Sequence, residues 1–207
     1  MNTKIIAITA IVALFSTASV TTAQDIAKGK PFGGQPWPIP GLIQAENFDE
    51  GPEGVAFHET DGLRGNLVSR PYRNSPVDIE DTPEGTFHVG FIAAGEWLTY
   101  TVVVKRAGTY DIELSMGAEA KPSSLHIEFN GVDKTGPIQS ELTKHWYDYA
   151  KVRKAGVHLD EGIQVMKVVF KDSGDTNLDS LRFIEVNPPK TEAKPAAVKP
   201  ETKPAAK

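Results

Sequence analysis

The feature that most constrains the fold of this chain is a period-two alternation of apolar and polar residues, repeated in several short segments. In residues 97–104, every second residue is large and apolar or aromatic: Leu98, Tyr100, Val102 and Val104. The same alternation occurs in residues 110–114 and 125–129, and it continues in 165–170 and 178–186. Because neighbouring side chains in a strand point to opposite faces of the sheet, each segment predicts a β-strand with one buried face.

The breaks between these segments have the composition of tight turns. They include Ala107-Gly108, Asn130-Gly131, Glu161-Gly162 and the run Ser173 to Asp175, residue types that adopt turn conformations readily. No segment keeps the apolar spacing of three and four residues that a long amphipathic helix requires. Short strands at regular spacing therefore predict an all-β domain, either a sandwich or a barrel.

Both ends of the 207-residue chain lack this pattern. Residues 1–23 have a basic start, an apolar run and a small polar end, which predicts a signal peptide cleaved after Ala23. The apolar run is shorter than the roughly 20 residues that a membrane span needs, so we expect a bacterial protein that is secreted or periplasmic. Residues 24–38 are expected to be a linker, and residues 188–207, rich in Lys, Pro and Ala, a disordered tail.

Composition excludes several classes of protein. The chain has no Cys, so neither a disulfide framework nor a lipoprotein anchor is available. The net charge is −5; the tail from Pro188 carries +3 and Lys4 adds +1, which leaves −9 for residues 24–187. An acidic body disfavours nucleic acid as a partner. The tail is either a solvated spacer or an electrostatic contact to anionic envelope polymers.

Several separated motifs carry a family resemblance. They are AENFDEGPEGVAFHET from Ala45, VDIE from Val77, VGFIAAGEWLTYTV from Val89, the aromatic group at Trp146, and NLDSLRF from Asn177. In this order and spacing the chain resembles the family 6 carbohydrate-binding modules over residues 39–186. The resemblance implies a jelly-roll β-sandwich of two antiparallel sheets, here residues 39–187, that binds a polysaccharide or oligosaccharide without catalysis.

The resemblance also implies where the sugar lies. The main site would lie in loops at one end of the sandwich, with a sugar ring between Phe91 and Trp146 and its hydroxyl groups held by Asn177 and His58. A second site on the concave sheet face would centre on Trp97. The chemistry is reasonable, because C–H patches of a pyranose stack on aromatic faces while its hydroxyl edge needs fixed polar partners.

Each of these residues also has a structural interpretation. Trp146 could belong to the core, and Trp97 could pack against a neighbouring loop. Asn177 could cap a turn. His58 could be a surface residue without a ligand, and a shift of the alignment by one residue would put Glu59 in its place.

A metal site is also expected. Gln44 and Glu46 would project to the same side of the first strand, and Asp179 lies in the last. If these two strands are neighbours, as the resemblance implies, their three side chains would converge on a structural Ca²⁺, which prefers oxygen ligands. The alternative places Asp179 in a turn and Glu46 in a surface ion pair.

Enzymatic motifs are absent from the sequence: there is no GxSxG, no HExxH and no Gly-rich phosphate loop. A small glycoside hydrolase would need only two carboxylates, for which Glu80 and Glu96 are the candidates. The other alternative is an envelope scaffold that acts through its tail. Deletion of the tail would separate that function from glycan binding.

Overall fold

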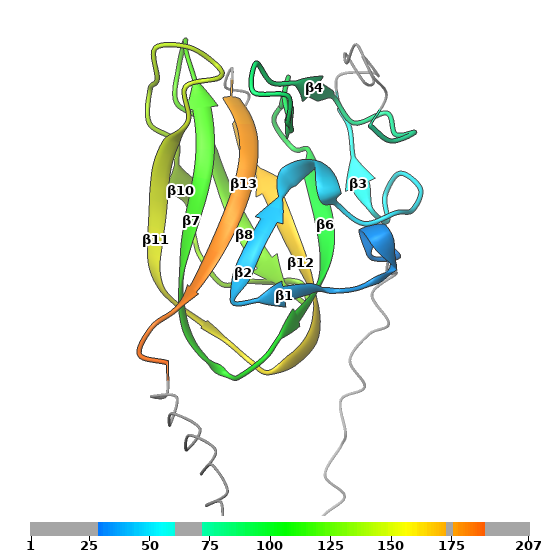
Figure 1. Cartoon of the computed structure of the whole chain (residues 1–207), viewed down its shortest axis with the longest axis vertical. Helices are drawn as coiled ribbons and strands as arrows, with labels where there is room; N and C mark the ends of the chain where they lie inside the picture. Colours follow the sequence, from blue (N-terminus) through cyan, green and yellow to red (C-terminus); the bar gives the residue numbers. More distant parts are fainter. Residues whose placement is uncertain (1–28, 61–71, 173–175, 189–207) are drawn as a thin grey trace, which may run out of the picture.

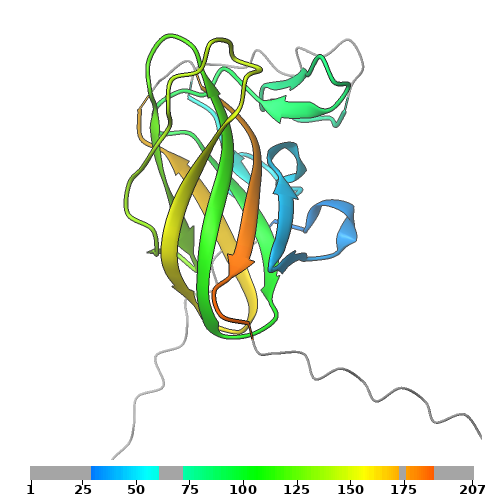
Figure 2. The ribbon, with the colours of Figure 1, turned by 60° about the vertical axis from the view of Figure 1, so that its left-hand side comes forward.

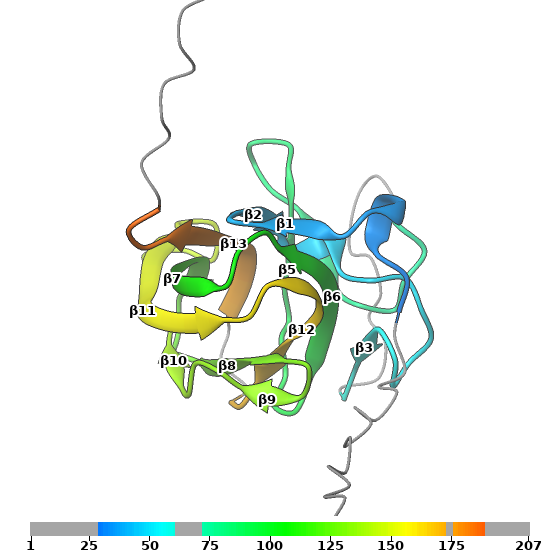
Figure 3. The same ribbon diagram turned by 90° about the horizontal axis from the view of Figure 1, so that it is seen from below.

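The computed structural model describes residues 29–60, 72–172 and 176–188. These residues form two β-sheets packed face to face, with loops gathered at the two ends of the strands (Figure 1). The view from below separates the two layers and shows the interior between them (Figure 3). The alternation predicted an all-β sandwich or barrel and the family resemblance implied the sandwich, and the sandwich is confirmed.

The first sheet has β6 and β12 at its centre. β6 pairs with β12, β12 with β8, and β1, β3, β9 and β10 complete the sheet at its margins. β1 runs parallel to β6, and the other pairs are antiparallel. The strands of this sheet are β1 (Trp37–Ile39), β3 (Phe57–His58), β6 (Trp97–Val104), β8 (Ser124–Phe129), β9 (Val132–Asp133), β10 (Ile138–Gln139) and β12 (Gly162–Phe170).

The second sheet is antiparallel and is built around β7 and β13. Its order is β11, β7, β13, β5, β4, and β2 pairs with another part of β13. The pair β4 and β5 stands out from the side of the sandwich in Figure 2. The strands are β2 (Gly41–Gln44), β4 (Ile79–Asp81), β5 (Phe87–Val89), β7 (Gly108–Ala118), β11 (Ala150–Leu159) and β13 (Thr176–Glu185).

The core lies between the two sheets and consists of the residues that the alternation selects. The apolar side chains of β6, β7 and β8 that face inward are buried: Leu98, Tyr100, Val102, Val104, Tyr110, Ile112, Leu114, Leu125, Ile127 and Phe129. The buried Tyr100 hydroxyl donates to the Ala45 carbonyl at 2.8 Å, so its polar atom is satisfied. None of the helices in the described residues is long and apolar enough to cross a bilayer.

The described part of the predicted linker, residues 29–38, belongs to the fold. Lys30 forms a β-bridge with Glu50, η1 spans Phe32–Gly34, and β1 begins at Trp37. The ordered domain therefore starts earlier than the predicted Ile39. The predicted signal peptide (1–23) and nearly all of the predicted tail lie outside the described residues and remain predictions.

A half-buried arginine fastens the segment that follows β2. The Arg73 guanidinium donates to the carbonyls of Glu46, Phe48 and Asp49 at 2.6–3.1 Å, and it lies 3.8 Å from the centre of the Phe48 ring. These charge-assisted hydrogen bonds satisfy carbonyl groups that do not pair within a sheet. They hold the turn after β2 against the sandwich.

Candidate functional site

A pocket of about 230 Å³ opens at the end of the sandwich where β13 begins. The end of the sandwich where β13 begins is at the top of Figure 1. Its lining combines three aromatic residues with three polar ones: Phe91, Trp146, Tyr147, Glu80, Thr176 and Asn177. The structure thus brings Phe91, Trp146 and Asn177 together in one place, although they are far apart in the sequence.

Trp146 projects from the loop that precedes β11, and its backbone fixes its position. The Asn177 side-chain amide donates to the Trp146 carbonyl at 3.3 Å. A Cβ on Gly117 would lie 2.1 Å from the same carbonyl oxygen, so only glycine allows the loop to approach β7 so closely. Trp146 is 39% exposed, which excludes it from the core and leaves its ring accessible to a ligand.

Phe91 also lines the pocket, from the loop after β5. Its φ of +48° is a left-handed conformation that a bulky residue rarely adopts. Its side chain is 42% exposed. A large apolar ring held in an unfavourable backbone conformation and left half in solvent is typical of a ligand contact.

The polar floor of the pocket is organised around Gly90. A Cβ at this position would lie 2.5 Å from Glu80 Oε2 and 3.0 Å from Asn177 Oδ1. Because the Asn177 nitrogen donates to Trp146, its oxygen is the atom presented next to Gly90. The floor therefore presents two hydrogen-bond acceptors side by side.

A buried histidine holds Glu80. His88 stands opposite Glu80 in the β4 and β5 pair and is fully buried. Its Nε2 lies 3.0 Å from Glu80 Oε2, and its Nδ1 lies 2.6 Å from the Tyr149 hydroxyl. Burial raises the pKa of Tyr149 well above its ordinary value, with the charge of Asp179 adding to the effect. Tyr149 therefore stays protonated and can donate to His88.

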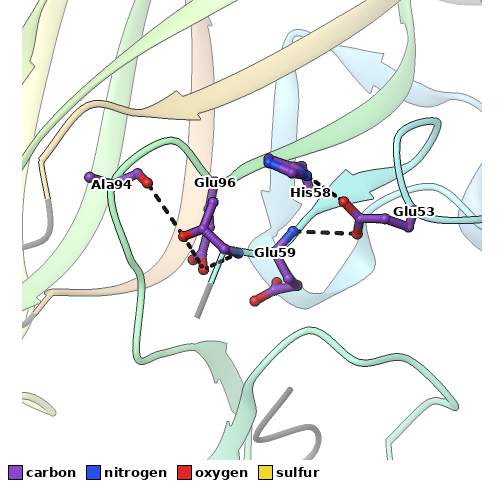
Figure 4. Close-up of polar contacts among 6 residues, drawn as sticks. Glu53, His58, Glu59, Ala94 and Glu96 are labelled. Atoms are coloured by element: carbon purple, nitrogen blue, oxygen red, sulfur yellow. Dashed lines mark hydrogen bonds and ion pairs between the residues drawn. The ribbon is translucent and has the colours of Figure 1, made fainter. Parts of the chain in front are cut away.

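His58 lies elsewhere. β3 pairs with β6 so that His58 stands opposite Trp97, and the two rings stack with centroids 6.1 Å apart. His58 also contacts Glu53, and the Glu59 amide donates to the same Glu53 carboxylate (Figure 4). His58 is thus absent from the residues lining the pocket, and its expected place beside Asn177 was wrong, because strand pairing carries it to the other sheet.

Trp97 lies on the outer face of the first sheet, as the alternation predicts, and is half-buried. The Lys167 ammonium lies 4.1 Å from its ring centroid, in cation-π geometry. With His58 stacked on it as well, Trp97 already packs against side chains of its own chain. Its ring is less available to a ligand than that of Trp146.

Glu96 accepts hydrogen bonds from Thr60, in the segment after β3, and from its own loop. Its Oε1 accepts from the Thr60 amide and hydroxyl at 3.1 and 3.3 Å, and its Oε2 accepts from the Ala93 amide at 2.8 Å. Figure 4 shows the Glu96 side chain beside the segment that follows His58. Glu80 lines the pocket and Glu96 does not, so the two carboxylates do not flank a common pocket.

The expected metal ligands are close in the fold, although not as the sequence suggested. β2 ends at Gln44, which pairs with Ser180 beside Asp179, and Glu46 follows in the 3₁₀ turn η2 (Ala45–Asn47). The expectation that Gln44 and Glu46 share one strand was therefore wrong. Glu46 is 4% exposed, and its Oε2 has no hydrogen-bond partner among the described residues.

Burial and, to a smaller extent, the negative charge of Asp179 raise the pKa of Glu46 from 4.5 to about 7. A carboxylate oxygen that is buried, unpaired and close to a second carboxylate fits a cation ligand. Within residues 29–60, 72–172 and 176–188, however, no three His, Asp or Glu side chains gather to hold a metal by themselves. A site here would need the Gln44 amide and further oxygen ligands.

Comparison with known families identifies the chain. The model of the family 6 carbohydrate-binding modules matches residues 71–185, more than half of the sequence. The chain belongs to this family. No curated protein sequence matches the module.

Solved structures agree with the module in fold. A family 6 module from Clostridium stercorarium, solved with cellobiose, has 18% identity and a TM-score of 0.56; the match covers 74% of this chain and 99% of that one. A module of Cellvibrio mixtus lichenase 5A, solved with cellotriose, has 23% identity and a TM-score of 0.53, with 72% and 98% covered. A β-1,3-glucan-binding module from Bacillus halodurans has 20% identity and a TM-score of 0.52, over 72% and 98%.

Sequence reasoning missed three residues of the pocket. Tyr147 and Thr176 were not singled out, and Glu80 was considered only as one of two candidate catalytic carboxylates. Thr176 is buried, and its hydroxyl has no hydrogen-bond partner within the described part of the module. The VDIE motif did mark Glu80, but its neighbours become visible only when β4 pairs with β5.

Proposed function

We propose that the module binds a polysaccharide or oligosaccharide by stacking a sugar ring against Phe91 and Trp146, with Asn177 fixing its hydroxyl groups. The observation that carries this proposal is the convergence of two exposed aromatic rings and a fixed amide in one pocket. Membership of a family of sugar-binding modules supports it independently.

The chemistry of the lining matches a sugar ring. Aromatic faces attract the apolar C–H patches of a pyranose, and fixed polar atoms orient its hydroxyl groups. Phe91 can stack but cannot donate a hydrogen bond, so the polar contacts must come from the floor of the pocket. Two of the similar modules were solved with cellobiose and with cellotriose, and a third binds β-1,3-glucan. These ligands support neutral β-linked glycans as the first to test.

The pocket is more accessible to a sugar ring than the Trp97 side chain is. Since Trp97 already contacts His58 and Lys167, a ligand would have to displace these contacts before stacking on the ring. The pocket requires no such rearrangement. We therefore expect the affinity for short oligosaccharides to depend on Trp146.

The test compares two tryptophan substitutions. Trp146→Ala should weaken binding of the tightest ligand among cellotriose, xylotriose and laminaritriose by about 2 kcal/mol, the loss typical of a binding hot spot. Trp97→Ala should leave that affinity nearly unchanged. Titration calorimetry measures both, and circular dichroism confirms folding. A folded Trp146→Ala protein with the affinity of the wild type would eliminate the pocket as the site.

A structural Ca²⁺ is the second part of the proposal. Gln44, Glu46 and Asp179 would supply oxygen ligands from the turn after β2 and from β13, and other oxygen atoms would complete the six to eight that Ca²⁺ takes. The unpaired Glu46 oxygen and its raised pKa support this assignment. The ion would stabilise the module because it binds only the folded chain.

We also propose that the protein is exported from the cytoplasm. The leader-like residues 1–23 and the absence of Cys suit a secreted or periplasmic protein. N-terminal sequencing of the exported protein should find Gln24 as the first residue. An intact Met1 in the exported protein would contradict the cleavage site.

A further inference from the structure

The loop that carries Trp146 is joined to the end of β7 by a side chain. β11 begins at Ala150, opposite Met116, so β7 continues past the start of its neighbour. Thr143 takes the place of that neighbour beside Ala118. Its amide donates to the Ala118 carbonyl at 2.7 Å, and its hydroxyl oxygen accepts from the Ala118 amide at 2.9 Å. A side-chain oxygen thus completes a pair that backbone atoms form elsewhere in the sheet.

The same hydroxyl group reaches His145. It donates to the His145 carbonyl at 2.8 Å, and the Asp148 amide donates to that carbonyl at 3.0 Å. The Thr143 side chain therefore links the last residue of β7 to the residue directly before Trp146. These bonds fix the backbone before Trp146 and leave the orientation of its ring to other contacts.

The His145 ring supplies such contacts. It meets the Trp146 ring edge to face, with centroids 5.6 Å apart, and it stacks on the Tyr147 ring with centroids 5.1 Å apart. Tyr147 in turn lies 5.4 Å from the ring of the buried His88. His145 is exposed and is not one of the described residues that line the pocket. It therefore supports two aromatic residues of the lining from outside the pocket.

This support matters because the Trp146 ring lies at the surface, where core packing does not hold it. A ring that samples several rotamers loses that freedom when a sugar binds, and the loss lowers the affinity. If the loop holds its binding arrangement for only a fraction of the time, the affinity falls by that fraction for every ligand of the pocket. Contacts that order the ring in advance strengthen binding without touching the sugar.

We propose that Thr143 and His145 are positioning residues of the pocket. Thr143 fixes the course of the loop through the His145 carbonyl, and the His145 ring orders Trp146 and Tyr147 before a ligand arrives. Neither side chain contacts the sugar. This inference rests on the proposed sugar-binding function of the same pocket, and it adds two residues that lie outside the lining.

The role of the His145 ring is tested by removing it and by replacing it with another ring. His145→Ala should weaken binding of the trisaccharide that binds best by about tenfold, the scale of two aromatic contacts. His145→Phe can make both contacts and should bind within about twofold of the wild type. Titration calorimetry measures the affinities, and thermal melting verifies folding.

His158→Ala is the matched control, because it removes the same side chain from the exposed end of β11 that lies far from the pocket. It should bind like the wild type. A His145→Phe protein as weak as His145→Ala, or a His145→Ala protein with the affinity of the wild type, would overturn the role of the ring.

Thr143→Val keeps the shape of the side chain and removes the hydroxyl group, so the Ala118 amide and the His145 carbonyl lose a partner. It should weaken binding by about tenfold, and Thr143→Ser, which keeps the hydroxyl group, should restore the affinity. Thr109→Val, at the opposite end of β7, should have no effect. A Thr143→Ser protein that binds as weakly as Thr143→Val would contradict the role of the hydroxyl group.

A double variant tests whether the two residues act together. Because both act through the position of one loop, Thr143→Val combined with His145→Ala should lose little more affinity than the weaker of the two single variants. Fully additive losses would show that they do not form one positioning unit.

Ligand length separates positioning from direct contact. His145→Ala should weaken binding of the trisaccharide and of the pentasaccharide of the same series by the same factor, because it changes the population of the competent loop. A larger factor for the pentasaccharide would show that His145 contacts the sugar chain itself. A lower melting temperature with unchanged affinity would show a purely structural role. Either outcome eliminates the proposal.

Failure of this inference differs from failure of the proposed function. If Trp146→Ala abolishes binding while Thr143→Val and His145→Ala bind like the wild type, the module binds sugar in this pocket and the positioning role is wrong. If Trp146→Ala has no effect, or no oligosaccharide binds, the proposed function itself fails.

Discussion

At the scale of single residues, the place of Trp146 depends on a residue that has no side chain. Gly117 lies in β7, directly beneath the Trp146 carbonyl, and a Cβ there would come within 2.1 Å of the oxygen. No contact this short is tolerated between non-bonded atoms, and the obstacle is backbone rather than a flexible side chain. The aromatic wall of the pocket therefore depends on a small residue in a neighbouring strand.

Gly117→Ala should consequently weaken glycan binding even though residue 117 does not line the pocket. The added methyl group would push the loop outward and break the hydrogen bond from Asn177 to the Trp146 carbonyl. We expect a loss of about tenfold in affinity, equivalent to about 1.4 kcal/mol, as measured by titration calorimetry.

Gly108→Ala is the matched control, because it adds the same methyl group to the first residue of β7, where nothing lies within 4 Å of the new Cβ. Its affinity should remain that of the wild type. If Gly117→Ala also binds normally and remains folded, the loop does not need its present position.

The residues of the pocket differ in how far the sequence could predict them. Phe91, Trp146 and Asn177 stand in motifs for which the family resemblance implies a shared site, and the structure brings them together. His58 also belongs to a motif, but the pairing of β3 with β6 decides its neighbour. Tyr147 follows Trp146 directly, and only the course of the loop determines that both residues line the pocket.

At the scale of elements, the turn after β2 is connected to β13 by charge as well as by strand pairing. Glu46 in η2 and Asp179 in β13 repel one another when both are ionised, and burial adds to the cost of charging Glu46. A bound cation would remove this repulsion. The region is therefore expected to respond to pH and to calcium together.

In the presence of a chelator, the melting temperature should fall between pH 5 and pH 8. The pKa of Glu46 is raised on folding from 4.5 to about 7, so its contribution to stability is complete below about 4.5 and is lost as the pH rises through 7. The effect is at most about 3 kcal/mol. Calcium should restore the melting temperature, and more strongly at pH 8, because it binds the ionised carboxylate.

Glu46→Gln serves as the control for this experiment. Asp49 also has a pKa raised by burial, so part of the pH effect belongs to it and should persist in the variant. The calcium effect should disappear. Equal melting temperatures of the wild type in chelator and in calcium at pH 8 would rule out the ion.

The strands themselves were more predictable than their connections. Alternation identified the inward faces of β6, β7 and β8, because burial against the opposite sheet imposes a period of two. The three residues of β1 and the turn η2 are too short to show any period. The conformation of such short elements is determined by tertiary contacts, such as the hydrogen bonds from Arg73 to the segment after β2.

At the scale of the whole molecule, the two sheets act as a rigid support for loops at one end of the sandwich. β13 lies in the middle of its sheet and supplies Thr176 and Asn177, while loops beside it supply Phe91 and Trp146. Such an arrangement presents a preformed surface to a ligand. This arrangement positions the groups that bind a ligand.

Glycoside hydrolysis requires two carboxyl groups on either side of the scissile bond, one as acid and the other as base or nucleophile. Glu80 is held in the pocket by His88, whereas Glu96 accepts three hydrogen bonds from the 60 and 93 positions and lies outside the lining. The full-length module should therefore release no reducing sugar from any polysaccharide that it retains. A reducing-end assay over a day, with Glu80→Gln and Glu96→Gln as controls, measures this directly. Hydrolysis that disappears in either variant would make the module an enzyme; a slow release that both variants retain would identify a contaminating activity, because neither candidate carboxylate would then contribute to it.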